Sequence, residues 1–250
     1  MYQAGFSTLG FPGRPVPEVL DVATRHGADL VQLRIAEDEP VNPGLSSRGR
    51  AEVASRFGDA GVAVGALATY VRLSDPDLLE PLHTHLELAV DLGAPALRLF
   101  PGDTEPEVAA DRLAAAVDAA EGSGVRLTVE THDAFLSGTA IARLLAGVTG
   151  RAGAVWDLLH TWRSGEKPAD SAALLGPYLA EFQIKDVSSA EDRRPLVPGT
   201  GVLPIRETVA LVRGNGFTGP IVFEHEARWY ADAAPFEESL AAALRLARGE

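Results

Sequence analysis

The feature that most constrains the fold of this chain is a regular alternation between two kinds of segment. Short apolar runs rich in β-branched and aromatic residues alternate eight times with longer runs, rich in alanine and leucine, whose apolar residues repeat at helical spacing. The predicted strands are residues 3–8, 30–35, 62–71, 96–100, 126–131, 152–158, 179–187 and 219–226. The predicted helices are residues 16–27, 47–61, 75–93, 105–124, 137–148, 170–179, 205–216 and 235–248.

Eight strand–helix pairs in 250 residues average about 31 residues each, which is typical of a (β/α)₈ TIM barrel. A doubly wound open sheet is the competing α/β architecture, but it usually carries a glycine-rich GxGxxG turn after its first strand. The first predicted strand is instead followed by TLGFPGRP. Because the chain has no low-complexity linker, we expect residues 1–250 to form a single TIM-barrel domain.

Charge and composition exclude several classes of partner. The chain has 22 basic and 35 acidic residues, a formal charge of −13, and therefore lacks the basic surface that nucleic-acid binding requires. It has no apolar run long enough for a membrane span and no secretory signal at its N-terminus, so we expect a cytoplasmic protein. The absence of cysteine excludes disulfides, thiolate ligands and cysteine nucleophiles.

Four consecutive predicted strands end in ionisable or amide side chains. These strands finish TVETHD, VWDLLH, FQIKD and VFEHE. In a TIM barrel all strands point the same way, so their C-terminal ends meet at the face that carries the active site. Polar caps on solvent-facing strand ends are the competing interpretation, which four successive strands disfavour. The candidate site residues are Glu130, His132, Asp157, His160, Gln183, Lys185, Glu224 and Glu226.

The three carboxylates of Glu130, Asp157 and Glu224 would repel one another at this face unless a cation neutralised them. Oxygen ligands, one of them the amide of Gln183, favour Mn²⁺, Mg²⁺ or Co²⁺ over a metal that prefers thiolates. The sequence therefore predicts one divalent metal ion, with Lys185 offsetting the remaining negative charge.

These motifs, together with PGTGVLPI and VFEHEARW and in this order, resemble the sugar phosphate isomerase/epimerase family, the xylose-isomerase-like TIM barrels also called AP endonuclease family 2. The resemblance implies that Glu130, Asp157, Gln183 and Glu224 bind one divalent metal, with Mn²⁺ first among the candidates. It also implies that Glu130 and Glu224 exchange a proton with the substrate carbon and that His160 contacts the substrate. Gln183 departs from the ketose 3-epimerases, which have histidine there, and matches the inosose dehydratase branch.

We therefore predict a metal-dependent isomerase or epimerase of carbohydrate metabolism that acts on a small sugar or polyol through an enediolate. The predicted catalytic residues are Glu130 and Glu224, and the predicted substrate-binding residues are His132, His160, Lys185 and Glu226. The alternatives are a metal-dependent dehydratase of a keto-inositol-like cyclic polyol and a non-catalytic barrel subunit. The resemblance also implies a homo-oligomer, since relatives often form dimers or tetramers.

Overall fold

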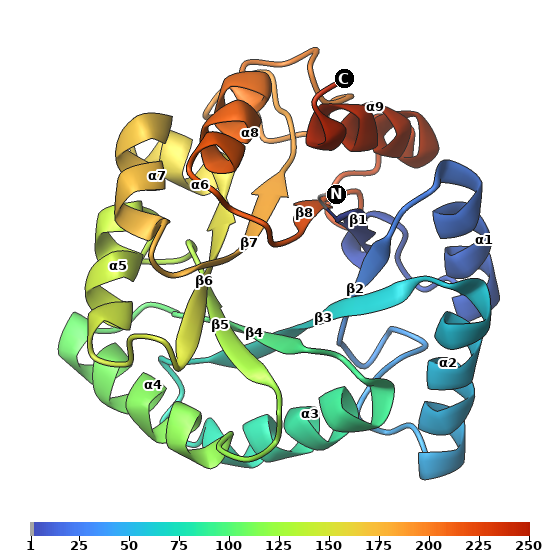
Figure 1. Ribbon diagram of the computed structural model, residues 1–250, viewed down its shortest axis with the longest axis vertical. Helices are drawn as coiled ribbons and strands as arrows, with labels where there is room; N and C mark the ends of the chain where they lie inside the picture. The colour runs from blue at the N-terminus through green and yellow to red at the C-terminus, as the bar shows by residue number, and fades with distance from the viewer. Residues whose placement is uncertain (1–2) are drawn as a thin grey trace.

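The computed structural model describes residues 3–250, and within them eight parallel strands form a closed barrel (Figure 1). Each strand pairs with its neighbours in sequence, and β8 closes the ring by pairing with β1, where Phe223 lies opposite Phe6. The fold prediction of a single (β/α)₈ barrel is confirmed. The strands are β1 (Ala4–Ser7), β2 (Leu30–Arg34), β3 (Ala63–Arg72), β4 (Ala96–Phe100), β5 (Arg126–Glu130), β6 (Ala152–Asp157), β7 (Leu179–Ile184) and β8 (Ile221–Phe223).

The helices form an outer ring around the barrel (Figure 1). Several of them have proline at the first or second helical position, and several end at a left-handed glycine such as Gly27 or Gly93. Within residues 3–250 the helices are η1 (Thr8–Gly10), α1 (Val16–His26), α2 (Ser47–Ala60), α3 (Leu79–Leu92), α4 (Pro106–Ala119), α5 (Gly138–Ala146), α6 (Leu158–Arg163), α7 (Pro168–Leu175), α8 (Ile205–Gly214) and α9 (Phe236–Arg248). None of them is long and apolar enough to cross a bilayer.

Helix α6 was not among the predicted helices, and it shortens the predicted sixth strand. The carboxylate of Asp157 accepts a hydrogen bond from the backbone N–H of Leu159 at 2.8 Å and a longer one from His160 at 3.4 Å. Asp157 is thus the N-cap of α6, which ends the strand and begins the helix at once. The predicted strands 179–187 and 219–226 also end early, at Ile184 and Phe223, because the chain leaves the barrel to form long loops.

The loop after β7 is held by Asp186. Its carboxylate accepts hydrogen bonds from the backbone N–H groups of Val187, Gly199, Gly201 and Leu203 at 2.8–3.2 Å. A Cβ at Gly201 would lie 2.3 Å from Asp186 Oδ1, so only glycine permits this approach. Asp186 therefore caps this loop.

The two surfaces of the barrel wall differ in chemistry. Side chains alternate along each strand, so one set faces the helices and the other faces the barrel interior. The set under the helices is apolar and includes Trp156 and Phe182, whose ring centroids lie 4.9 Å apart. The interior set is polar but equally buried, and Gln32 and Gln183 are both 0% exposed. This polar interior leads up to the C-terminal ends of the strands, which we call the barrel mouth.

Candidate active site

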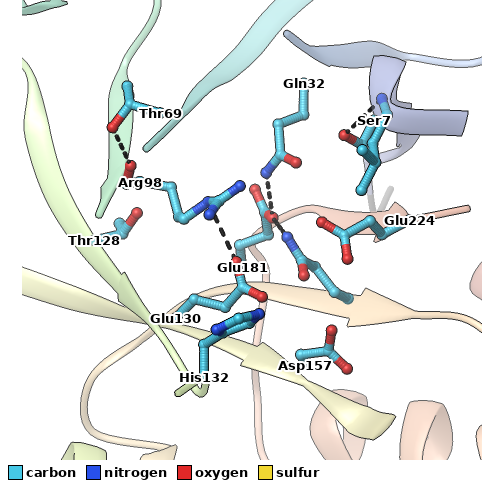
Figure 2. A network of polar contacts seen from close by, with 12 residues as sticks. Ser7, Gln32, Thr69, Arg98, Thr128, Glu130, His132, Asp157, Glu181 and Glu224 are labelled. Atoms are coloured by element: carbon cyan, nitrogen blue, oxygen red, sulfur yellow. Dashed lines mark hydrogen bonds and ion pairs between the residues drawn. The ribbon is translucent and has the colours of Figure 1, made fainter. Parts of the chain in front are cut away.

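The structure brings the predicted metal ligands together at the barrel mouth. Glu130 and Asp157 are the last residues of β5 and β6, Gln183 lies near the end of β7, and Glu224 follows β8. One carboxylate oxygen from each of Glu130, Asp157 and Glu224 lies within 4.8 Å of the others. Figure 2 shows these three side chains around a common space. All three are buried, so their mutual repulsion requires compensation by cations.

Lys185 supplies part of that compensation. Its Nζ lies 2.7 Å from Asp157 Oδ2 and 2.8 Å from Glu226 Oε1, and it also contacts Glu224. Burial would lower the pKa of Lys185, but Asp157, Glu224 and Glu226 outweigh it and hold the pKa well above its ordinary value. The ammonium group is therefore charged and joins the ends of β6 and β8. Glu226, predicted to bind substrate, contacts the site through Lys185.

Arg98 on β4 provides a second buried cation. Its Nε lies 3.2 Å from Glu130 Oε2, and its guanidinium carbon lies 3.8 Å from the centre of the Phe100 ring. Burial raises the pKa of Glu130 to about 8; Arg98 lowers it, while the nearby carboxylate of Glu224 raises it further. The carboxyl group of Glu130 therefore holds a proton more tightly than an exposed glutamate does.

Glu181, which was not among the predicted site residues, lies two residues before Gln183 on the interior face of β7. Its Oε1 accepts hydrogen bonds from Gln32 Nε2 at 2.6 Å and from Gln183 Nε2 at 2.8 Å. Burial raises the pKa of Glu181 to about 7, although the hydrogen bond from Gln183 and the charge of Arg98 oppose this. The alternation of side chains along β7 was the signal that could have revealed it.

The two predicted histidines lie side by side at the mouth, with ring centroids 4.6 Å apart. His132 Nδ1 lies 2.8 Å from Asp133 Oδ1; burial lowers the pKa of His132, but Asp133 and Glu130 together raise it above its ordinary value. His160 Nε2 lies 3.6 Å from Asp157 Oδ2. Burial, assisted by the charge of Lys185, holds the pKa of His160 well below its ordinary value, so this ring is neutral.

A cavity of about 330 Å³ opens above these groups. Its floor includes Glu130, His132, His160 and Glu224. Its walls come from loops and from β3 and β4, a contribution that the sequence analysis did not predict. These wall residues are Leu9, Tyr70, Arg72, Arg98, Phe100, Arg193, Glu226, Trp229 and Tyr230. The volume suits a small molecule, and the mixture of aromatic and charged groups suits one with several hydroxyls.

His225, between the two glutamates of the VFEHE motif, faces the opposite way. It is 0% exposed and packs against Phe223 and Phe236, with ring centroids 5.5 and 5.9 Å away. Burial lowers the pKa of His225 to about 4. This histidine therefore belongs to the apolar layer under the helices.

Residues 20–247 match the family model described as xylose isomerase-like TIM barrel. The chain belongs to this family, also called the AP endonuclease 2 family. A curated relative, an uncharacterized protein of Mycobacterium tuberculosis, is 35% identical over 92 residues. That match spans 37% of this chain and 33% of the relative.

Several solved structures share the whole fold of this chain. A D-psicose 3-epimerase of Clostridium cellulolyticum, solved with D-tagatose, has a TM-score of 0.82 at 16% identity, with 98% of each chain covered. A probable 3-DHS dehydratase of Bacillus anthracis has a TM-score of 0.80 at 16% identity, with the same coverage. The IolI protein, solved with a zinc atom, has a TM-score of 0.80 at 17% identity, covering 98% of this chain and 96% of the other. At these identities the likeness concerns the fold.

Proposed function

We propose that this chain is a divalent-metal-dependent isomerase or epimerase of a small sugar or polyol. The observation that carries the proposal is the cluster of carboxylates from Glu130, Asp157 and Glu224, with oxygens within 4.8 Å of one another in a buried barrel mouth. The D-psicose 3-epimerase, which shares the fold, supports a sugar substrate.

The donor atoms fit one divalent cation. Glu130 Oε2, Asp157 Oδ2 and Gln183 Oε1 are buried without a hydrogen-bond partner, although the first two lie near the cations Arg98 and Lys185. We propose Glu130, Asp157, Gln183 and Glu224 as the ligands, and Mn²⁺ as the ion, with Mg²⁺ or Co²⁺ as alternatives, because all four donors are oxygens. When bound, the ion acts as a Lewis acid that stabilises negative charge on a substrate oxygen.

The charge balance supports binding of a cation. Lys185 contacts three carboxyl groups and Arg98 contacts a fourth. The carboxyl groups at the mouth therefore outnumber the cationic side chains that contact them. Because buried charges are stable only when they are compensated, a site of this composition is complete with the ion in place.

Glu130 and Glu224 are our candidates for proton transfer. As the C–H bond next to the carbonyl breaks, its proton passes to one carboxylate, its electron pair forms a C=C bond to the carbonyl carbon, and the π pair of the carbonyl moves onto oxygen, which gives an enediolate. The other carboxylate returns a proton to the carbon, and return on the opposite face inverts the centre. The neutral ring of His160, together with His132 and Lys185, would hold substrate hydroxyls, with Glu226 orienting Lys185.

A dehydratase of a keto-inositol-like cyclic polyol is the second candidate. It begins with the same proton abstraction and then expels a hydroxyl group as water. Gln183 favours it, because the resemblance places glutamine at this position in the dehydratase branch, and the probable dehydratase of Bacillus anthracis shares the fold.

A substrate panel followed by NMR tests the proposal and separates the two reactions. The purified chain, stripped with chelator and reloaded with Mn²⁺, Mg²⁺ or Co²⁺, would be incubated with ketoses, keto-inositols and their phosphates. Inversion or carbonyl transfer without loss of water supports the isomerase, and an enone product supports the dehydratase. Full activity in the chelated protein would contradict the metal dependence, and a chain that binds no metal and converts no substrate would indicate a non-catalytic barrel.

A further inference from the structure

We propose that Glu181 is a positioning residue, which fixes the carboxamide of Gln183 with its oxygen toward the metal and its NH₂ group toward the barrel interior. The inference rests on the proposed function, because it concerns a ligand of the proposed metal. It adds to the four ligands a buried residue that holds one of them in its binding orientation.

The geometry of β7 places Glu181 behind Gln183. Both side chains face the barrel interior, and Gln183 Nε2 donates to Glu181 Oε1 at 2.8 Å. Gln183 is paired in register with Asp157 of β6, so its side chain stands beside another proposed ligand. Its Oε1 is buried and has no hydrogen-bond partner in the described part of the chain. Each end of the amide therefore has a distinct environment.

An amide needs such a partner because its two ends have nearly the same shape and opposite polarity. A carbonyl oxygen can bind a cation, whereas an NH₂ group turned the same way would present two donor hydrogens to it. Glu181 Oε1 accepts hydrogen bonds from the NH₂ groups of both Gln32 and Gln183, so an amide beside this oxygen turns its NH₂ group toward it and its own oxygen away. Glu181 thus excludes the orientation of Gln183 that cannot bind a cation.

Gln32 offers an internal control. It donates to the same Oε1 of Glu181 at 2.6 Å, and it is equally buried. Gln32, however, lies on β2, where it pairs in register with Ser7 and Ala66, away from the proposed ligands on β5–β8. If Glu181 acts by turning the Gln183 amide, loss of Gln32 affects metal binding little. If the whole network acts only by filling the barrel, the two losses have similar effects.

The experiment measures Mn²⁺ affinity of the full chain by isothermal titration calorimetry, with thermal unfolding of the metal-free protein alongside. We expect E181M to weaken Mn²⁺ binding by about 10–100-fold, the usual cost of removing a group that orients a ligand. We expect Q32M to change it by less than about threefold. E181M leaves two buried amide donors unpaired, those of Gln32 and Gln183. Should E181M fail to fold, the Q32M/E181M double variant removes one of these donors. We expect it to weaken Mn²⁺ binding as much as E181M does.

The Q183H substitution shows whether Glu181 acts by orienting the side chain at position 183 or only by supporting the packing of the barrel interior. An imidazole can present a lone pair to the metal by shifting its proton to the other nitrogen, so it needs no partner to choose which end faces the ion. We therefore expect the E181M change to cost only about threefold in a Q183H background, against the 10–100-fold expected in the native one. An equal loss in both backgrounds, or an E181M affinity equal to that of the unaltered chain, would overturn the inference. An unaltered chain that binds no Mn²⁺ would instead overturn the proposed function itself.

Discussion

The inner and outer surfaces of the barrel wall are both buried, yet they solve the problem of burial in opposite ways. Under the helices, strands contribute residues such as Leu97, Trp156 and Phe182, which are less than 2% exposed and need no partner. On the inner side, Glu130 and Lys185 are 2% and 3% exposed and are stable only through ion pairs.

The boundary between the two surfaces runs between adjacent residues. Glu224 contacts Lys185 on the inner side, whereas His225 packs against Phe223 and Phe236 on the outer side. One peptide bond thus separates a charged site from an apolar layer. The outer surface therefore maintains the fold, whereas the inner surface holds the buried charged groups, so changes on the two sides should have separable effects.

The largest effect is expected from removing the carboxylates that transfer protons. E130Q and E224Q keep the size of the side chain, but an amide cannot accept the proton. We expect each to lower kcat on the substrate found by the panel by about 10³-fold, within the range for loss of a general acid or base. Circular dichroism should show an unchanged fold. Activity within tenfold of the unaltered chain would remove that residue from the proposed mechanism.

Loss of Lys185 should destabilise the metal-free protein. K185M leaves Asp157, Glu224 and Glu226 without their shared cation, and breaking a buried ion pair by removing one partner costs about 3–5 kcal/mol. Denaturant unfolding without metal measures this free energy. Saturating Mn²⁺ should restore more stability to K185M than to the unaltered chain. The exposed Lys167 provides the control, since K167M should change neither quantity, and a K185M as stable as K167M would contradict the account.

The outer surface should show its own dependence on pH through His225. The pKa of His225 is about 4 in the folded chain, against about 6.5 in the unfolded chain. Below pH 6.5 the unfolded state therefore binds a proton that the folded state does not, so this contribution to stability is present above pH 6.5 and is lost as the pH falls toward 4. The difference between the two pKa values corresponds to about 3 kcal/mol of unfolding free energy.

Unfolding free energies at pH 7 and pH 4.5 for the unaltered chain and H225L isolate this contribution. H225L should lose less stability between the two pH values than the unaltered chain. Identical losses would show that His225 is not held neutral by the apolar layer.

The smallest effect is expected from shortening an apolar side chain on the outer surface of the barrel wall, away from the site. F182L removes aromatic contact with Trp156 and should cost about 1 kcal/mol of unfolding free energy. Because Phe182 faces the helices while Gln183 faces the interior, we expect Mn²⁺ affinity to change by less than about twofold. A loss of Mn²⁺ affinity greater than tenfold would show that the two surfaces are not separable.

The sequence predicted the outer surface and the strand ends well because both follow local periodicity. Eight alternations determined the barrel, and the position of Glu130 and Asp157 at strand ends brought them to one face. Partner choice was harder to predict. That Arg98 contacts Glu130 depends on the pairing of β4 with β5, and that Glu226 contacts Lys185 depends on the path of a loop after β8.

Other parts of the site lay beyond local patterns. Helix α6 depends on a cap formed by Asp157, but in the sequence this residue is equally compatible with the end of a strand. Tyr70 and Trp229 reach one cavity from β3 and from the loop after β8, which are distant in the sequence. Glu181 alone followed a simple rule, the twofold alternation along β7, and could have been found by extending it from Gln183.

The central claim is that Glu130, Asp157, Gln183 and Glu224 together bind one divalent ion. Anomalous diffraction from crystals of the chain grown with Mn²⁺ tests it most directly. We expect one manganese peak per chain at the barrel mouth, within coordination distance of an oxygen from each of these four side chains. No peak at the mouth, or a peak there bound by the two histidines without Asp157 and Gln183, would contradict it.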